Sequence, residues 1–196
     1  MRRLRNFLSA CLTGVALVAC AAASPNISDM SRVSGDEILL VGKIELNPPL
    51  LKSEQNFSDG IGFDVFENGI GFYLGDAVVL PGVRYQGKRK SQHLVGLGKD
   101  FFIKSARSAP LYYSAPFMRL STDPTDVMRF PGALRFEFPA GAKAVYIGTI
   151  RYHRNEYLEI TKAETLDEFP RVRKEFEARF GRGVSLTRAK VSPVQK

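Results

Sequence analysis

The chain contains two histidines, His93 and His153, which are the natural candidates for acid–base chemistry near neutral pH. A hydrolytic triad needs a serine nucleophile, an oriented histidine and an acid. No Gly-x-Ser-x-Gly motif marks such a serine. We therefore interpret both histidines as surface or turn residues, His93 beside the basic run 88–90 and His153 at a hairpin end near Glu156. The sequence assigns no catalytic residue.

Metal and cofactor motifs are also missing. There is no His-Glu-x-x-His, Cys-x-x-Cys or phosphate-binding glycine loop. A zinc site built from His93, His153 and a carboxylate has no supporting ligand spacing. The pair Gly60 and Gly62 precedes a predicted strand pair and does not lie at a strand-to-helix turn, so it is not a dinucleotide fingerprint. We expect no metal and no cofactor.

The basic residues gather in one segment, residues 84–107, where Asp100 is the single acid. The rest of the chain after residue 19 is close to neutral. Residues 84–90 are typical of an exposed loop, which can attract anionic partners. The alternative is a solvated loop whose lysines resist edge pairing of strands. The candidate residues for an anionic partner are Arg84, Lys88, Arg89, Lys90, Lys99, Lys104 and Arg107.

Short apolar or alternating stretches, separated by Gly, Pro, Asn and Asp, predict the strands that must position these side chains. The clearest is 134–138, in which aromatic and aliphatic residues alternate with Arg135 and Glu137. A hairpin turn is predicted at Asn68-Gly69. The predicted strands are 38–46, 61–66, 71–80, 101–104, 111–118, 134–138, 144–152, 157–163 and 184–191, with a loop over 121–132.

The first predicted strand, 38–46, has an echo later in the chain. Its even apolar positions are expected to face inward, while Lys43 and Glu45 face outward. Its run Val41-Gly42-Lys43-Ile44 resembles Ile147-Gly148-Thr149-Ile150. We interpret the two glycines as small residues that core strands need where the facing layer comes close.

One helix is predicted near the C-terminus. Asp167 is its N-cap candidate, Pro170 lies in the first turn, and Gly181 is a natural stop. Its apolar stripe consists of Phe169, Val172, Phe176 and Phe180. Many short strands and one late helix predict a mainly β fold: an antiparallel β-sandwich or barrel-like fold with one C-terminal α-helix, as a single domain over residues 37–191 with a tail at 192–196.

The N-terminus carries a different kind of signal. Three arginines in the first five residues precede residues 7–19, which carry no charge and are too few to span a bilayer as a helix. The run ends in Leu17-Val18-Ala19-Cys20, which resembles the lipobox of bacterial lipoproteins. The alternative is an ordinary secreted protein cut at an Ala-x-Ala site around Ala19, Ala21 and Ala23.

The lipoprotein resemblance implies removal of residues 1–19 and a diacylglycerol on Cys20, followed by a flexible tether over 20–36. Ala21 and Ala22 after the cysteine favour the outer membrane, facing the periplasm. Cys11 leaves with the signal, so the domain has no disulfide and depends on burial. Nucleic acid is a poor partner for an exported, anchored protein.

Two functions are compatible with these features. The first is a non-enzymatic envelope lipoprotein, an accessory or structural subunit that binds an envelope protein or an anionic glycan or lipid. Small β-sandwich lipoproteins of envelope assemblies, with a transthyretin- or Ig-like plan, look similar. The second is an envelope hydrolase with a site on the sandwich. A histidine in a cleft, within hydrogen-bond reach of a serine or carboxylate, would favour the second; exposed histidines at strand ends would favour the first.

Overall fold

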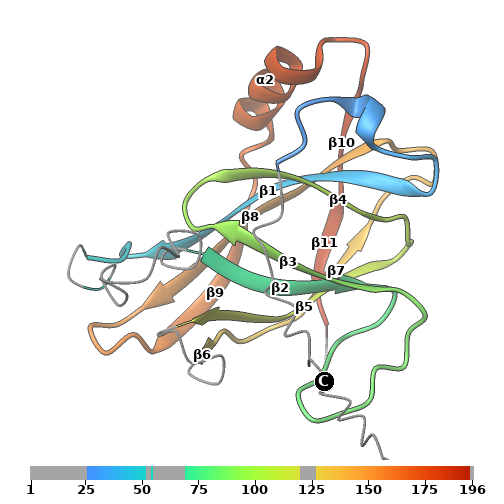
Figure 1. The fold of residues 1–196 in the computed structure, drawn as a ribbon. Coiled ribbons are helices and arrows are strands. Elements are labelled where there is room, and N and C mark those ends of the chain that lie inside the picture. Colours follow the sequence, from blue (N-terminus) through green and yellow to red (C-terminus); the bar gives the residue numbers. More distant parts are fainter. Residues whose placement is uncertain (1–25, 52–53, 55–68, 120–126, 195–196) are drawn as a thin grey trace, which may run out of the picture.

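The computed structural model describes residues 26–51, 54, 69–119 and 127–194, and they form two packed β-sheets with a helix against one of them (Figure 1). Sheet A consists of β1 (Glu37–Asn47), β4 (Asp100–Ala106), β8 (Ala144–Arg154), β9 (Ile160–Leu166) and β10 (Leu186–Arg188). Sheet B consists of β2 (Gly69–Gly75), β3 (Lys90–Gly96), β5 (Leu111–Arg119), β6 (Val127–Arg129), β7 (Leu134–Glu137) and β11 (Lys190–Pro193).

The prediction of a mainly β sandwich with one C-terminal helix is confirmed, and the barrel alternative falls because the two sheets do not close on each other. Strand pairing in sheet B is antiparallel throughout its described strands. Sheet A departs from the predicted antiparallel pairing, since β8 runs parallel to both β1 and β10. The long pair β1 and β8 therefore forms the centre of sheet A.

The main core lies between the sheets. The inward positions of β1 predicted from the sequence, Ile38, Leu40, Ile44 and Leu46, all belong to it. The opposite face of β1 is buried as well, because Leu39 and Val41 pack under the helix. The molecule is thus layered as sheet B, sheet A and helix, which explains why β1 is apolar on both faces in its first half.

The helix α2 (Phe169–Phe180) uses the predicted stripe, with Val172 and Phe176 fully buried. Its first residue follows Glu168 as N-cap, one position later than predicted. The Asp167 carboxylate still accepts a hydrogen bond from the Phe169 amide at 3.0 Å, so it satisfies one of the free N–H groups of the first turn. Gly181 ends the helix at φ 77°, as predicted.

Residues 26–36 are not tether, although the sequence assigned them to it. Ile27 is buried, and its amide donates to the Phe102 carbonyl oxygen at 2.7 Å. The Asn26 side-chain oxygen accepts from the Phe102 amide at 2.8 Å, and a short 3-10 helix η1 (Met30–Arg32) follows. The segment covers edge strand β4, whose backbone groups would otherwise lack partners.

The C-terminal strand predicted at 184–191 is two strands in different sheets. β10 pairs with β8 in sheet A, and after Ala189 the chain crosses to pair with β7 in sheet B as β11. Ser192 pairs with Arg135 and Pro193 with Leu134, so β11 extends into the stretch that the sequence assigned to a tail. The crossing joins the two sheets covalently at one edge of the sandwich.

The predicted hairpin at Asn68-Gly69 is wrong in the part that the structure describes. Gly69 is already the first residue of β2, paired with Gly96 on β3, and the strand ends at Gly75, well before residue 80. The predicted strand 61–66 lies outside the described residues. The hairpin partner of β2 is instead β3, a strand with a polar first half that shows no clear alternation in the sequence.

Strand β9 also begins three residues later than predicted, after a turn closed by Asn155 and Glu159.

Candidate anion-binding site

The loop between β2 and β3, residues 76–89, is held closed by Asp76. This carboxylate accepts hydrogen bonds from the backbone amides of Lys88, at 3.0 Å, and Arg89, at 3.2 Å. The Tyr85 hydroxyl lies 2.7 Å from both Asp76 Oδ1 and the Arg89 carbonyl oxygen, and it accepts from the Ala77 amide. The hydrogen bond from Tyr85, with those from the two amides, holds the pKa of Asp76 below its ordinary value.

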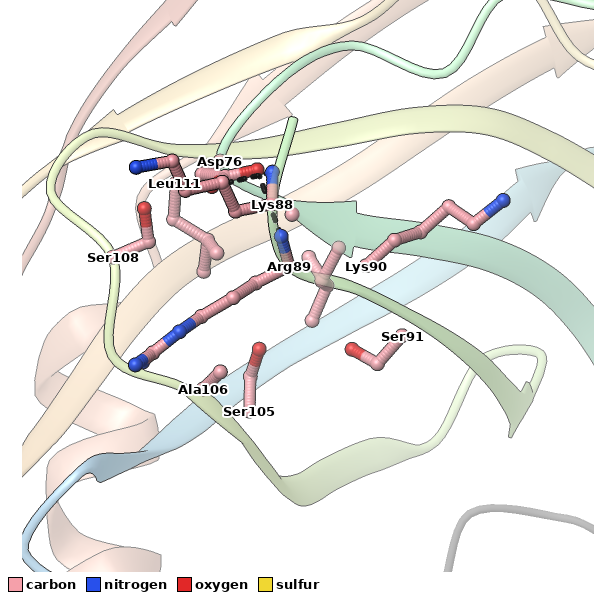
Figure 2. A pocket seen from close by; sticks show the side chains of 11 residues that line it. Asp76, Lys88, Arg89, Lys90, Ser91, Ser105, Ala106, Ser108 and Leu111 are labelled. Atoms are coloured by element: carbon pink, nitrogen blue, oxygen red, sulfur yellow. Dashed lines mark hydrogen bonds between the residues drawn. The ribbon is translucent and has the colours of Figure 1, made fainter. Parts of the chain in front are cut away.

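A pocket of about 270 Å³ lies between the base of this loop and the end of β4 (Figure 2). The Arg89 side chain runs across it toward Ser105 and Ala106, and the hydroxyls of Ser91 and Ser105 face the same space. Lys90 points away, with its Nζ over the rings of Tyr73 and Tyr85 at 5.2 and 5.4 Å. The lining residues are Leu74, Gly75, Asp76, Lys88, Arg89, Lys90, Ser91, Ser105, Ala106, Ser108 and Leu111.

The charge of this pocket is positive. Within the described ranges, no carboxylate forms an ion pair with Arg84, Lys88, Arg89 or Lys90. The acid that lines the pocket, Asp76, is engaged by hydrogen bonds from Tyr85 and from the amides of Lys88 and Arg89. The pKa of Asp36 is lowered chiefly by the hydrogen bond from Ser34 and also by the charges of Arg89 and Lys104. A guanidinium with serine hydroxyls beside it is a donor set suited to phosphate or carboxylate oxygens.

The other basic candidates do not join this pocket. Lys104 pairs with Glu37 at 3.0 Å. Arg107 donates to the carbonyl oxygens of Ala140, Ala142 and Glu37 at 2.6, 2.9 and 3.1 Å, which ties β4 to β1 and to the turn before β8. Lys99 lies in the turn between β3 and β4, at the other end of β3 from Lys90. The basic segment of the sequence is therefore not one patch in space.

His93 is not the surface residue that the sequence suggested. It is 8% exposed on β3 and stacks on Phe72, with ring centroids 5.8 Å apart. Its Nε2 lies 2.8 Å from Ser91 Oγ, at the edge of the pocket. Burial lowers the pKa of His93 to about 4, so the imidazole is neutral at pH 7. His93 thus lies within hydrogen-bond reach of a serine, although the imidazole itself is not among the residues that line the pocket.

His153 lies in β8, one residue before the strand ends at the hairpin turn to β9, as the sequence predicted. Its Nε2 is 2.8 Å from Glu164 Oε1 on β9, and its Nδ1 is 3.2 Å from Asn47 Nδ2. Hydrogen bonds from Lys162 and His153 lower the pKa of Glu164 to about 2. These residues form part of an ion-pair cluster on the outer face of sheet A. None of them lines the pocket that Arg89 crosses.

Sequence reasoning missed the residues that build the pocket. Asp76 and Ser105, which line the pocket, and Tyr85, which holds the loop, carry no motif, and only the packing of sheet A on sheet B brings β4 next to the loop. The one available signal was Pro81-Gly82, which marks a turn after β2.

In the part of the chain that is described, no group of three His, Cys, Asp or Glu side chains could hold a metal ion, and no helix is long and apolar enough to cross a membrane.

Comparison of the chain with protein-family models, curated proteins and solved structures finds no match.

Proposed function

We propose that this protein is a non-catalytic, lipid-anchored accessory subunit of the bacterial cell envelope, which binds an anionic partner through the pocket at the base of the β2–β3 loop. The observation that carries the binding is Arg89, which has no ion pair with a described carboxylate and lies across a pocket lined by serine hydroxyls. Among the seven basic candidates, Arg89 and Lys88 are the ones best placed to contact the bound group.

The lipobox resemblance at Cys20 supports the anchor, and Ala21 and Ala22 after it support a location at the outer membrane, facing the periplasm. Residues 26–36 pack on sheet A, and five residues, 21–25, lie in the sequence between Cys20 and this packed segment. A chain of that length spans at most about 20 Å when extended. The anchored domain therefore stays close to the bilayer. Replacing Cys20 with Ser should release the protein from the membrane fraction; unchanged fractionation and mass would disprove the anchor.

Anion binding is tested with phosphocellulose, a matrix that presents phosphate groups. The double variant Lys88→Glu/Arg89→Glu should elute at much lower salt than the unaltered protein, because two pocket cations become anions. The matched control is Lys99→Glu/Lys104→Glu, which makes the same change in net charge outside the pocket. Equal elution of the two double variants would show that only the overall charge matters, and the pocket proposal would fail.

A second candidate, an envelope hydrolase, is favoured by the 2.8 Å contact between Ser91 Oγ and His93 Nε2. In such an enzyme, Ser91 would attack and His93 would take its proton. The lowered pKa, about 4, argues against it, since a general base that activates serine has to hold the proton in the transition state. A buried imidazole also needs a hydrogen-bond partner for structural reasons alone. Hydrolysis of p-nitrophenyl esters that is lost in Ser91→Ala would reverse this preference.

A further inference from the structure

The tip of the β2–β3 loop is an apolar turn, residues 80–83. The Val83 amide donates to the Leu80 carbonyl oxygen at 3.2 Å, with Pro81 and Gly82 between them and Gly82 at φ 74°. This is the geometry of a type II turn, for which Pro followed by Gly is well suited. Leu80 and Val83 are 54% and 53% exposed. The turn thus presents two aliphatic side chains to solvent.

This exposure is built into the loop. The Val79 amide donates to Ser114 Oγ on β5 at 3.0 Å, next to the turn. At the loop base, Asp76 holds the amides of Lys88 and Arg89. These two attachments hold both ends of the segment that carries Leu80 and Val83. In the view of Figure 1 the green loop extends from the sandwich on the side opposite α2.

Cations follow directly after the apolar turn. Arg84, Lys88, Arg89 and Lys90 are exposed and form no ion pair with a described carboxylate, while the loop's one acid, Asp76, is engaged in hydrogen bonds. An apolar tip followed by these cations matches the surface of an anionic bilayer, where acyl chains lie below a layer of phosphates. An apolar groove on a protein could bind the tip, but it would not explain why the neighbouring charges are all positive.

We infer that the β2–β3 loop docks on an anionic lipid bilayer, with Leu80 and Val83 among the acyl chains and Arg84, Lys88 and Arg89 at the headgroup phosphates. This inference rests on the proposed function, since it names the anionic partner of the same loop. It gives the protein a second membrane contact besides Cys20. The two contacts together orient the domain on the bilayer.

The chain has no tryptophan, so a single introduced indole reports on its own position. In the full chain carrying Leu80→Trp, mixed with phosphatidylcholine vesicles containing phosphatidylglycerol, the emission should shift to shorter wavelength and be quenched by brominated lipids. Phosphatidylcholine alone should give neither effect. The matched control is Tyr157→Trp, at a side chain that is 76% exposed in the turn between β8 and β9. Its emission should stay that of an indole in water.

The comparison of two positions removes the influence of Cys20, because a lipid that recruits the chain recruits both variants equally. Adding Lys88→Ala or Arg89→Ala to Leu80→Trp should weaken partitioning about fivefold each. A water-like emission of residue 80 on all vesicles, or equal shifts at residues 80 and 157, would overturn the inference. If phosphocellulose binding persists in that case, anion binding stands and its partner is a soluble anion or a protein.

Discussion

Gly42 on β1 and Gly148 on β8 meet where the pairing of these two parallel strands slips by one residue. The register passes from Val41 opposite Tyr146 to Lys43 opposite Thr149. A Cβ atom on residue 42 would lie 3.0 Å from the Gly148 carbonyl oxygen and 2.8 Å from Ile147 Cγ1. Both glycines are therefore requirements of one bulge in the centre of sheet A.

Gly148→Ala should destabilise the protein by about 1–3 kcal/mol, because Gly148 has φ 95°, a conformation that residues with a Cβ rarely adopt. The added methyl group would also lie 2.6 Å from Thr165 Cγ2 on β9. Denaturant unfolding measures the change. Gly141→Ala is the control, since a Cβ there meets nothing within 4 Å, and it should change stability by less than about 0.5 kcal/mol. Equal effects at the two positions would contradict the bulge argument.

Tyr113 on β5 and Tyr152 on β8 join the two sheets by hydroxyls 3.2 Å apart, and both side chains are buried. Replacing either with Phe leaves the other hydroxyl without this partner and should cost about 1–3 kcal/mol. The double Phe variant should cost less than the sum of the two single changes, because no unpaired hydroxyl remains. A double-mutant cycle in urea measures the coupling. Additive effects would show that the two hydroxyls do not interact.

Glu168 should make the protein sensitive to acid. Its hydrogen bond from Thr149, at 2.6 Å, and its ion pairs with Lys43 and Arg171 lower its pKa to about 2. A carboxylate whose pKa is lower in the folded state adds stability above the unfolded pKa, about 4.3, and loses it as the pH falls toward the folded value. Glu168→Gln should therefore be less stable than the unaltered protein at pH 7, with the difference shrinking from pH 4.5 to pH 2.

The control for this pH dependence is Glu156→Gln, at an exposed residue in the turn between β8 and β9. Thermal unfolding from pH 2 to pH 7 should give nearly parallel profiles for this variant and the unaltered protein. If Glu168→Gln also runs parallel to the unaltered protein over the whole range, the ion pairs of Glu168 contribute nothing measurable to stability.

Local patterns in the sequence predicted much of the fold and little of the pocket. The stripe of α2 and the alternation in β7 were sufficient because each element buries one regular face. The glycine echo pointed to a real constraint, but the close neighbours of Gly42 belong to the adjacent strands and not to the facing layer. Strand β3 was missed because the Lys90 end of the strand is polar and its ladder is set by β2.

Long-range pairing accounts for the remaining differences. No local pattern shows that the chain crosses from one sheet to the other at Ala189, since both halves are equally suited to a strand. Nor does any pattern show that Ile27 covers β4, because a single apolar residue in a polar stretch is ordinary. The pocket depends on the approach of Ser105, on β4 of sheet A, to Arg89, in the loop that leads into β3 of sheet B.

Tyr85→Phe should loosen the β2–β3 loop and weaken anion binding while leaving the fold intact. Its hydroxyl contacts Asp76, the Ala77 amide and the Arg89 carbonyl oxygen, so it joins the first residues of the loop to the backbone of Arg89. Without it, amide hydrogen exchange at Lys88 and Arg89 should accelerate, since their acceptor Asp76 loses its own partner. Elution from phosphocellulose should shift to lower salt, although no charge has been removed.

The matched control for the loop is Tyr112→Phe. It also removes a tyrosine hydroxyl, but one that makes no hydrogen bond to a described residue. This variant should leave amide exchange at Lys88 and Arg89 and the elution position unchanged. Faster exchange in Tyr85→Phe with unchanged elution would mean that the loop does not preorganise Arg89 for binding. Unchanged exchange would mean that Asp76 holds the two amides without help from Tyr85. In that case binding should not weaken either, because fixing Arg89 in advance raises affinity only by avoiding the entropy cost of ordering it on binding.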